Sequence, residues 1–359
     1  MTKPVIAAGA VLAALFAAGP AGFEQMLAPS TPENRRNSEA DILALPGHKL
    51  LLAWNEFYTT QGSDWGAARL ASRWSRDGGR TWSEKTVLQE NIGTMNVMEP
   101  DLIRLRSGKV LFAFCRKNSE ADCAPLLRVS TDDAQTFTPP VPIPIDPAPS
   151  YTGMNNDRMI QLRSGRVILP LWYTTDYRVD RHIRTRVYYT DDEGRTWKRS
   201  ATLVDIPDST AGAQEPGVVE LKDGRLLMWI RTDKGHIYRS LSKDRGETWS
   251  PPEAMQLESP RSPQTIKRIP STGDLLLVWN NSPTRRTPLT AAISRDDGKT
   301  WTHFRNLEDD AARTYAYTSM EFDRDQVLLT YYVGPPSGAG PTAGWSLKLK
   351  ALPVRWFYQ

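Results

Sequence analysis

One eight-residue pattern, SxDxGxTW with Ser or Thr in the first place, recurs along the chain and constrains its fold more than any other feature. Four full copies start at Ser75, Thr190, Ser242 and Ser294. A weaker copy, STDDAQTF, starts at Ser130 and lacks both the glycine and the tryptophan. The five starts are separated by 55, 60, 52 and 52 residues. A period of this size is typical of stacked or circular repeat architectures.

We interpret each copy as a turn that joins two strands. The aspartate can accept hydrogen bonds from turn amides, the glycine permits a positive φ, and the tryptophan covers the hairpin with a large apolar face. A catalytic or calcium-binding role is the competing interpretation. Local turn chemistry already explains these carboxylates, however, and four identical roles cannot form one site. We therefore predict a structural role for the repeated aspartates, which are Asp77, Asp192, Asp244 and Asp296.

Six apolar runs rich in β-forming residues each follow a turn. They read LPGHKLLLAW, RSGKVLFAF, RSGRVILPLW, KDGRLLMWI, STGDLLLVW and, more loosely, DRDQVLLTYY. A Gly or Asp turn between two strands is typical of an antiparallel hairpin, and no long helical pattern lies between Arg36 and Tyr332. Six such units predict an all-β fold, a six-bladed β-propeller. The C-terminal WSLKLKALPVRWFYQ would supply the closing strands that leave no edge of the ring unpaired.

The composition agrees with a globular protein. Of the 359 residues, 40% are hydrophobic and 24% are charged, and a net charge of +4 is spread over alternating acidic and basic residues. No nucleic-acid partner is predicted, because such partners favour clustered basic residues. No metal or other cofactor is predicted, because the histidines show no ligand spacing and no phosphate-binding loop is present. The histidines are His48, His182, His236 and His303.

The N-terminus is typical of a signal peptide. A lysine precedes an apolar run over residues 5–18, and small residues follow with a plausible cleavage site after Ala21. A membrane anchor is the alternative, but a spanning helix needs about 20 apolar residues. We expect residues 1–21 to be removed and residues 22–359 to form one domain that is secreted or periplasmic, with no membrane association after cleavage.

The two cysteines, Cys115 and Cys123, flank the segment CRKNSEADC. In an oxidising compartment they could form a disulfide across a hairpin, and two buried thiols are the equal alternative. The sequence does not indicate an oligomeric state.

Polar and charged residues gather just before the apolar runs. In a propeller the innermost strands of all blades converge on the axis, so one such cluster in each unit predicts a shared pocket. Buried charge is costly without a partner or a ligand, which indicates a polar binding pocket. The clusters are RRNSEAD from Arg35, NVMEPD from Asn96, NNDR from Asn155, QEP from Gln214, RSPQ from Arg261 and TYAYTS from Thr314.

These clusters and the repeated turns together resemble the sialidase (neuraminidase) superfamily, in which the turns are called Asp boxes. The resemblance covers nearly all of residues 22–359. Many non-enzymatic propellers also carry Asp boxes, so the ordered set of pocket residues is the more specific part. The resemblance implies a propeller with Asp-box turns that acts as an exo-acting, retaining glycoside hydrolase. Its substrate would be an acidic glycan from which it releases terminal sialic acid or a related acidic sugar.

The resemblance also implies roles for six residues. They are Arg36, Arg231 and Arg286 as the triad that holds the substrate carboxylate, Asp64 as the acid/base, and Glu215 with Tyr317 as the nucleophile pair. The strongest local match is QEPGVVELKDGRLLMWIR, which contains the glutamate and the second arginine.

The chain departs from the family pattern at the first arginine. The family's Arg-Ile-Pro motif is lost, so Arg35 competes with its neighbour for that place, and Arg285 competes in the same way for the third. Family members usually carry a glutamate that supports the first arginine, where this chain has Tyr331 and Tyr332. These differences put the identity of the sugar, or catalysis itself, in question.

The chemistry of these residue types supports the same roles. Planar guanidinium groups present forked donors to a carboxylate. A carboxylate nucleophile would be repelled by an acidic sugar, whereas a neutral Tyr317 polarised by Glu215 can attack the anomeric carbon. Asp64 would protonate the departing oxygen and then activate water.

Each residue also has a structural interpretation. An arginine can form a surface salt bridge, Asp64 can cap a turn, and Tyr317 can be an amphipathic strand residue. Four further residues either bind substrate in the sugar subsite or tie strands together, namely Asn155, Asn156, Asp157 and Arg158. Two other functions stay open: a hydrolase or lyase for another acidic (uronate) polysaccharide, and a non-catalytic propeller that binds glycans or proteins.

Overall fold

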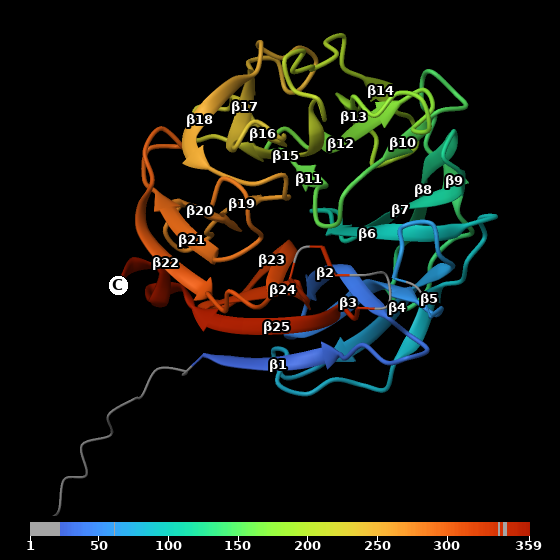
Figure 1. The fold of residues 1–359 in the computed structure, drawn as a ribbon, viewed down its shortest axis with the longest axis vertical. Helices are drawn as coiled ribbons and strands as arrows, with labels where there is room; N and C mark the ends of the chain where they lie inside the picture. Colours follow the sequence, from blue (N-terminus) through green and yellow to red (C-terminus); the bar gives the residue numbers. More distant parts are fainter. Residues whose placement is uncertain (1–21, 61, 337, 340–342) are drawn as a thin grey trace, which may run out of the picture.

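The computed structural model describes residues 22–60, 62–336, 338–339 and 343–359, and the regular structure in these ranges is almost entirely β-strand (Figure 1). Their one helical element is the short 3₁₀ helix η1 (Val354–Tyr358). No helix within these ranges is long and apolar enough to cross a membrane. The all-β prediction is therefore confirmed. The predicted signal peptide, residues 1–21, lies outside the described residues.

Three of the sheets each contain four consecutive strands, paired antiparallel in order. The first consists of β2 (Arg36–Leu45), β3 (Lys49–Phe57), β4 (Ala68–Ser75) and β5 (Thr86–Gln89). The second consists of β15 (Gln214–Glu220), β16 (Leu226–Arg231), β17 (His236–Ser242) and β18 (Glu253–Glu258). The third consists of β19 (Thr265–Arg268), β20 (Leu275–Asn280), β21 (Leu289–Ser294) and β22 (Thr302–Glu308).

A larger sheet of nine strands combines two sets of strands. One set is β6 (Asn96–Arg104), β7 (Val110–Ser119), β8 (Asp122–Ser130) and β9 (Val141–Pro142). The other is β10 (Tyr151–Gly153), β11 (Ile160–Gln161), β12 (Val167–Thr174), β13 (Arg184–Thr190) and β14 (Lys198–Arg199). The two sets meet where β10 runs parallel to β8, at the pair Tyr151 and Cys123.

The fifth sheet brings both ends of the described chain together. Its order is β1 (Phe23–Ala28), β25 (Ser346–Pro353), β24 (Gln326–Gly334) and β23 (Thr314–Asp323). The C-terminal segment thus forms β25, and β1 pairs along its outer edge, which the sequence did not predict. Figure 1 shows the sheets arranged around a centre, with β2, β6, β11, β15, β19 and β23 nearest to it.

The apolar core lies between neighbouring sheets. Trp54 of β3 packs with Leu347 and Leu349 of β25 in one cluster, and Trp229 packs with Trp279 in another. Trp54 and Trp279 are fully buried, and burying a large apolar side chain stabilises a fold by about 2 to 3 kcal/mol. This packing between neighbouring sheets determines how the innermost strands are oriented toward one another.

The repeated turns have the structural role that the sequence predicts. In the first copy the Asp77 carboxylate accepts hydrogen bonds from Thr81 N at 2.9 Å and from Thr81 Oγ1 at 2.6 Å. Gly79, with φ of 86°, donates its amide to Ser75 Oγ at 2.9 Å. The weak copy keeps the same bond, from Ala134 N to Ser130 Oγ at 2.9 Å. Each aspartate is therefore occupied within its own turn.

The two cysteines are both buried and are free thiols. Cys115 lies in β7 and Cys123 in β8, where their side chains join the same apolar cluster. The sequence left open a disulfide or two buried thiols, and the structure contains two buried thiols.

Candidate active site

Four of the strands nearest the centre carry a β-bulge, and each bulge places at least one residue in the lining of the same pocket. Strand pairing shifts its register within residues 38–41, 98–101, 214–217 and 316–319. The pocket-lining residues at these bulges have positive φ angles: Glu39 (40°), Glu99 (65°), Glu215 (42°) and Tyr317 (58°). Such a conformation costs a non-glycine residue about 1 to 3 kcal/mol and is found most often at functional sites.

Tyr317, Glu215 and Arg231 form a connected group on one side of the pocket. Tyr317 Oη donates to Glu215 Oε1 at 3.2 Å. Arg231 Nη1 lies 2.5 Å from the same carboxylate oxygen and 3.4 Å from the tyrosine oxygen. Both side chains of the ion pair are about 10% exposed, at 10% and 11%. The sequence predicted all three residues, and the structure brings them together.

The surroundings keep Tyr317 protonated. Burial raises the pKa of Tyr317, and the Glu215 carboxylate raises it further, against the opposing effects of Arg231 and Arg286. The second oxygen of Glu215, Oε2, is buried and has no hydrogen-bond partner among the described residues. A proton that leaves Tyr317 can therefore pass to the Glu215 carboxylate, which contacts the phenol through Oε1 and has a second oxygen, Oε2, without a partner among the described residues.

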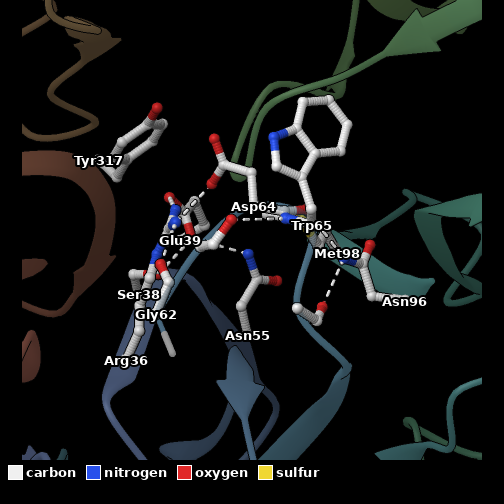
Figure 2. A network of polar contacts seen from close by, with 12 residues as sticks. Arg36, Ser38, Glu39, Asn55, Gly62, Asp64, Trp65, Asn96, Met98 and Tyr317 are labelled. Atoms are coloured by element: carbon white, nitrogen blue, oxygen red, sulfur yellow. Dashed lines mark hydrogen bonds and ion pairs between the residues drawn. The ribbon is translucent and has the colours of Figure 1, made fainter. Parts of the chain in front are cut away.

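Arg36 and Asp64 meet across the pocket, as Figure 2 shows. Arg36 Nη1 pairs with Asp64 Oδ1, and Arg36 Nη2 pairs with Glu39. Desolvation raises the pKa of Asp64, but Arg36 and Lys117 outweigh it and hold that pKa at about 2. Asp64 is therefore ionised in the free pocket. Arg35, the competing candidate, is not among the residues that line the pocket.

The third predicted arginine, Arg286, lies beside the tyrosines. Its Nη1 donates to Tyr332 Oη at 2.6 Å, and its guanidinium carbon is 5.7 Å from the centre of the Tyr317 ring. Arg285 instead donates to the carbonyl of Ala311 at 2.8 Å. The geometry thus favours Arg286 over its neighbour.

The first arginine is supported here by a glutamate of its own strand, and a tyrosine supports the third arginine. Tyr332 holds the third arginine, as described above, and Glu39 holds Arg36 from the same strand. The sequence analysis missed Glu39, although SEAD, MEPD and QEPG share a glutamate two residues before Asp or Gly. That shared spacing marks the bulge position, and it was the available signal.

The NNDR segment, which was predicted either to bind substrate or to tie strands together, makes contacts between strands. Its four side chains are buried, and none lines the pocket. Asn156 Nδ2 donates to the carbonyl of Ala40 at 2.6 Å, and Asp157 Oδ2 accepts from Met320 N at 2.8 Å. Arg158 Nη2 donates to the carbonyl of Gln264 at 3.0 Å. Asn155 is also buried, and its side-chain atoms have no partner among the described residues.

An aromatic wall that the sequence analysis did not identify completes the pocket. It consists of Trp65, Tyr151, Trp172 and Tyr177. Lys117 Nζ lies 4.8 Å from the centre of the Trp65 ring. Glu99 faces this wall, and burial raises the pKa of its carboxyl, which accepts from Met154 N at 3.1 Å. Arg261 also lines the pocket. The arrangement combines cationic donors for an anion, a tyrosine–glutamate pair, and flat surfaces of the kind on which sugar rings pack.

Comparison with known proteins gives a consistent result. A family model described as BNR repeat-like domain matches residues 97–329. A sialidase from Micromonospora viridifaciens is 28% identical over 314 residues, which cover 77% of this chain and 47% of that protein. A sialidase from Bacteroides fragilis (strain YCH46) is 25% identical over 219 residues, which cover 57% of this chain and 39% of that protein.

A solved structure, that of the NanB sialidase from Streptococcus pneumoniae, has the same fold. It superposes with a TM-score of 0.73 at 14% identity, over 91% of this chain and 70% of that chain. The matched parts span less than half of the length of the two sialidases compared by sequence.

Proposed function

The chain belongs to the family of BNR repeat-like domains, and from this premise we propose that it is an exo-acting, retaining glycoside hydrolase. Its substrate would be a glycan that ends in sialic acid or a related acidic sugar. The observation that carries the proposal is the contact between Tyr317 and Glu215, with Arg231 bound to both. A tyrosine nucleophile requires a base in that position, and here the pair lines a pocket together with Arg231.

In the first step Tyr317 Oη forms a bond to the anomeric carbon while the glycosidic carbon–oxygen bond breaks. Glu215 accepts the phenolic proton, and Asp64 in its acid form gives a proton to the departing oxygen. In the second step Asp64 removes a proton from water, which attacks the same carbon, and the tyrosine leaves with its proton restored. Two displacements at one carbon give retention of configuration.

The arginines would hold the substrate's carboxylate. Arg231 and Arg286 both lie beside Tyr317, and Arg36 and Arg231 line the same pocket; Arg286 is not among the lining residues. Forked guanidinium donors match the planar carboxylate, and they place the adjacent anomeric carbon next to the phenol. A neutral nucleophile suits this position, because it is not repelled by the carboxylate held nearby.

We also infer that the fold is a six-bladed β-propeller. The two strand sets of the nine-stranded sheet are joined only through the short parallel pairing of β10 with β8. Dividing the sheet there leaves six sets of strands, one for each predicted unit. A crystal structure in which these two sets share a continuous ladder would contradict six blades.

We further propose that the protein is exported after cleavage behind Ala21. β1 starts at Phe23, so this cleavage would leave the strand that pairs with β25 intact. Mass spectrometry of the protein recovered outside the cytoplasm should give a chain that begins at Gly22. A chain that retains residues 1–21 would refute the proposal.

The proposed activity is tested by incubation with sialyllactose and aryl sialosides, followed by an assay for free sialic acid. A fluorinated sialic-acid inactivator should add one sugar mass to Tyr317, and Tyr317→Phe should abolish the labelling. No release from any sialoside by folded protein would refute sialidase activity. New reducing ends or unsaturated products from uronate polymers would identify the uronate alternative, and glycan binding without turnover would identify a binding protein.

A further inference from the structure

The guanidinium of Arg36 has almost no donor left for a ligand. Arginine has five N–H groups. Nε donates to Ser38 Oγ at 2.7 Å, and Nη1 donates to the carbonyl of Gly62 at 3.3 Å. Nη1 and Nη2 also pair with the carboxylates of Asp64 and Glu39. These contacts leave one N–H without a partner among the described residues, whereas a forked grip on a carboxylate needs two.

Of these partners, Asp64 is the one that can leave. The Glu39 side chain is 1% exposed, and its Oε2 also accepts from Asn55 Nδ2 at 2.7 Å. The Asp64 side chain is 58% exposed, and its ion pair with Arg36 is the one hydrogen bond that its carboxylate makes to the described residues. Because this carboxylate is largely exposed, it can leave the ion pair for solvent, while Arg36, which is 12% exposed, keeps Glu39 as its partner.

Hydrogen bonds from other strands hold the backbone of the loop at Asp64, but they do not hold its carboxylate. The carbonyl oxygen of Asp64 accepts from Asn96 Nδ2 at 2.9 Å and from Lys117 Nζ at 3.0 Å, and Figure 2 shows Asn96 close to Trp65, the next residue of the loop. A rotation of the Asp64 side chain alone is therefore enough to release Arg36.

Building on the proposed function, we propose that the carboxylate of an incoming substrate displaces Asp64 from Arg36, and that the freed Asp64 takes up one proton from the solvent. Binding of an acidic sugar would thereby create the carboxylic acid that protonates the leaving group. A sugar without a carboxylate leaves the ion pair between Arg36 and Asp64 intact. Asp64 then stays ionised and has no proton to give to the leaving group. The pocket then selects acidic substrates at the chemical step as well as in binding.

The charges around Asp64 explain the direction of this change. In the free pocket Arg36, Lys117 and Arg231 lower the pKa of Asp64 against the effect of desolvation. A bound carboxylate occupies Arg36 and adds a negative charge nearby, and both changes raise that pKa. The other titratable groups that face the pocket are Glu39, Glu99, Glu215, Tyr151, Tyr177, Tyr317 and Arg261.

Isothermal titration calorimetry tests this inference directly. The probe is 2,3-dehydro-2-deoxy-N-acetylneuraminic acid, titrated in buffers of different ionisation enthalpy between about pH 4 and 7. Wild-type protein should take up most of one proton per ligand at the lower end of this range. Its affinity should weaken by up to about tenfold per pH unit as the pH rises. Asp64→Asn should bind the probe with almost no proton uptake.

Two controls separate the possible outcomes. The methyl ester of the same probe carries no charge and should cause no uptake in either protein. Binding of the acid without uptake at any pH, or uptake that persists in Asp64→Asn, would overturn the inference alone. Failure of the acid to bind any form of the folded protein would overturn the proposed function, and the inference with it.

Discussion

Replacement of Tyr332 by phenylalanine is expected to weaken substrate binding through Arg286. The side chain is 4% exposed, and its Oη accepts from Arg286 Nη1 at 2.6 Å. Its ring lies 5.8 Å from that of Tyr317. The substitution keeps the ring and removes the shorter of the two hydrogen bonds that hold the guanidinium, since Arg286 Nη2 also donates to the carbonyl of Arg261 at 3.2 Å.

The size of the effect follows from that hydrogen bond. A hydrogen bond to a charged group contributes about 1.5 to 3 kcal/mol, and about 1.4 kcal/mol corresponds to a factor of ten. We expect kcat/KM for an aryl sialoside to fall by roughly 10- to 100-fold. Because Arg286 is proposed to grip the carboxylate before and during the reaction, KM should rise more than kcat falls.

The neighbouring tyrosine provides a matched control. Tyr331 is fully buried, and its Oη donates to Glu308 Oε1 at 2.5 Å, so its hydroxyl is bonded to Glu308 and not to Arg286. Tyr331→Phe should lower the melting temperature and leave the kinetic constants close to those of the wild type. Equal kinetic losses in the two variants, or unchanged kinetics in Tyr332→Phe, would refute the reasoning.

Three further predictions concern single carboxylates. Asp64→Ala should slow turnover most for substrates with poor leaving groups, which a series of aryl sialosides measures. Burial and Asp157 raise the pKa of Asp101 to about 7, so the stability from its proton should be lost as the pH rises from about 4 to 7. Urea unfolding of Asp101→Asn should show a flatter pH dependence over that range. Asp296→Ala should lower the unfolding free energy by roughly 2 kcal/mol without changing kcat, because the carboxylate loses two hydrogen bonds donated by Thr300 and one donated by Ser294.

The sequence by itself determined the features that depend on neighbouring residues. Each repeated turn closes through bonds between residues at most four apart, such as those from Thr81 to Asp77, so its pattern is readable in eight letters. The hairpins follow from the same short range, because a turn and two apolar runs specify the pairing. The Glu215 and Arg231 match was visible for this reason, since both lie in one hairpin.

Only the tertiary structure decided which side chains meet across the centre. Asp64 pairs with Arg36 from 28 residues away, and Asn156 donates to the carbonyl of Tyr317 across 161 residues. A bulge is defined by its partner strand, so only the pairing of β2 with β3 shows that the glutamate of SEAD lies at a bulge and lines the pocket. The physical reason is that the charge and hydrogen bonding of a pocket residue depend on groups from several sheets, and the spacing of one segment carries no information about them.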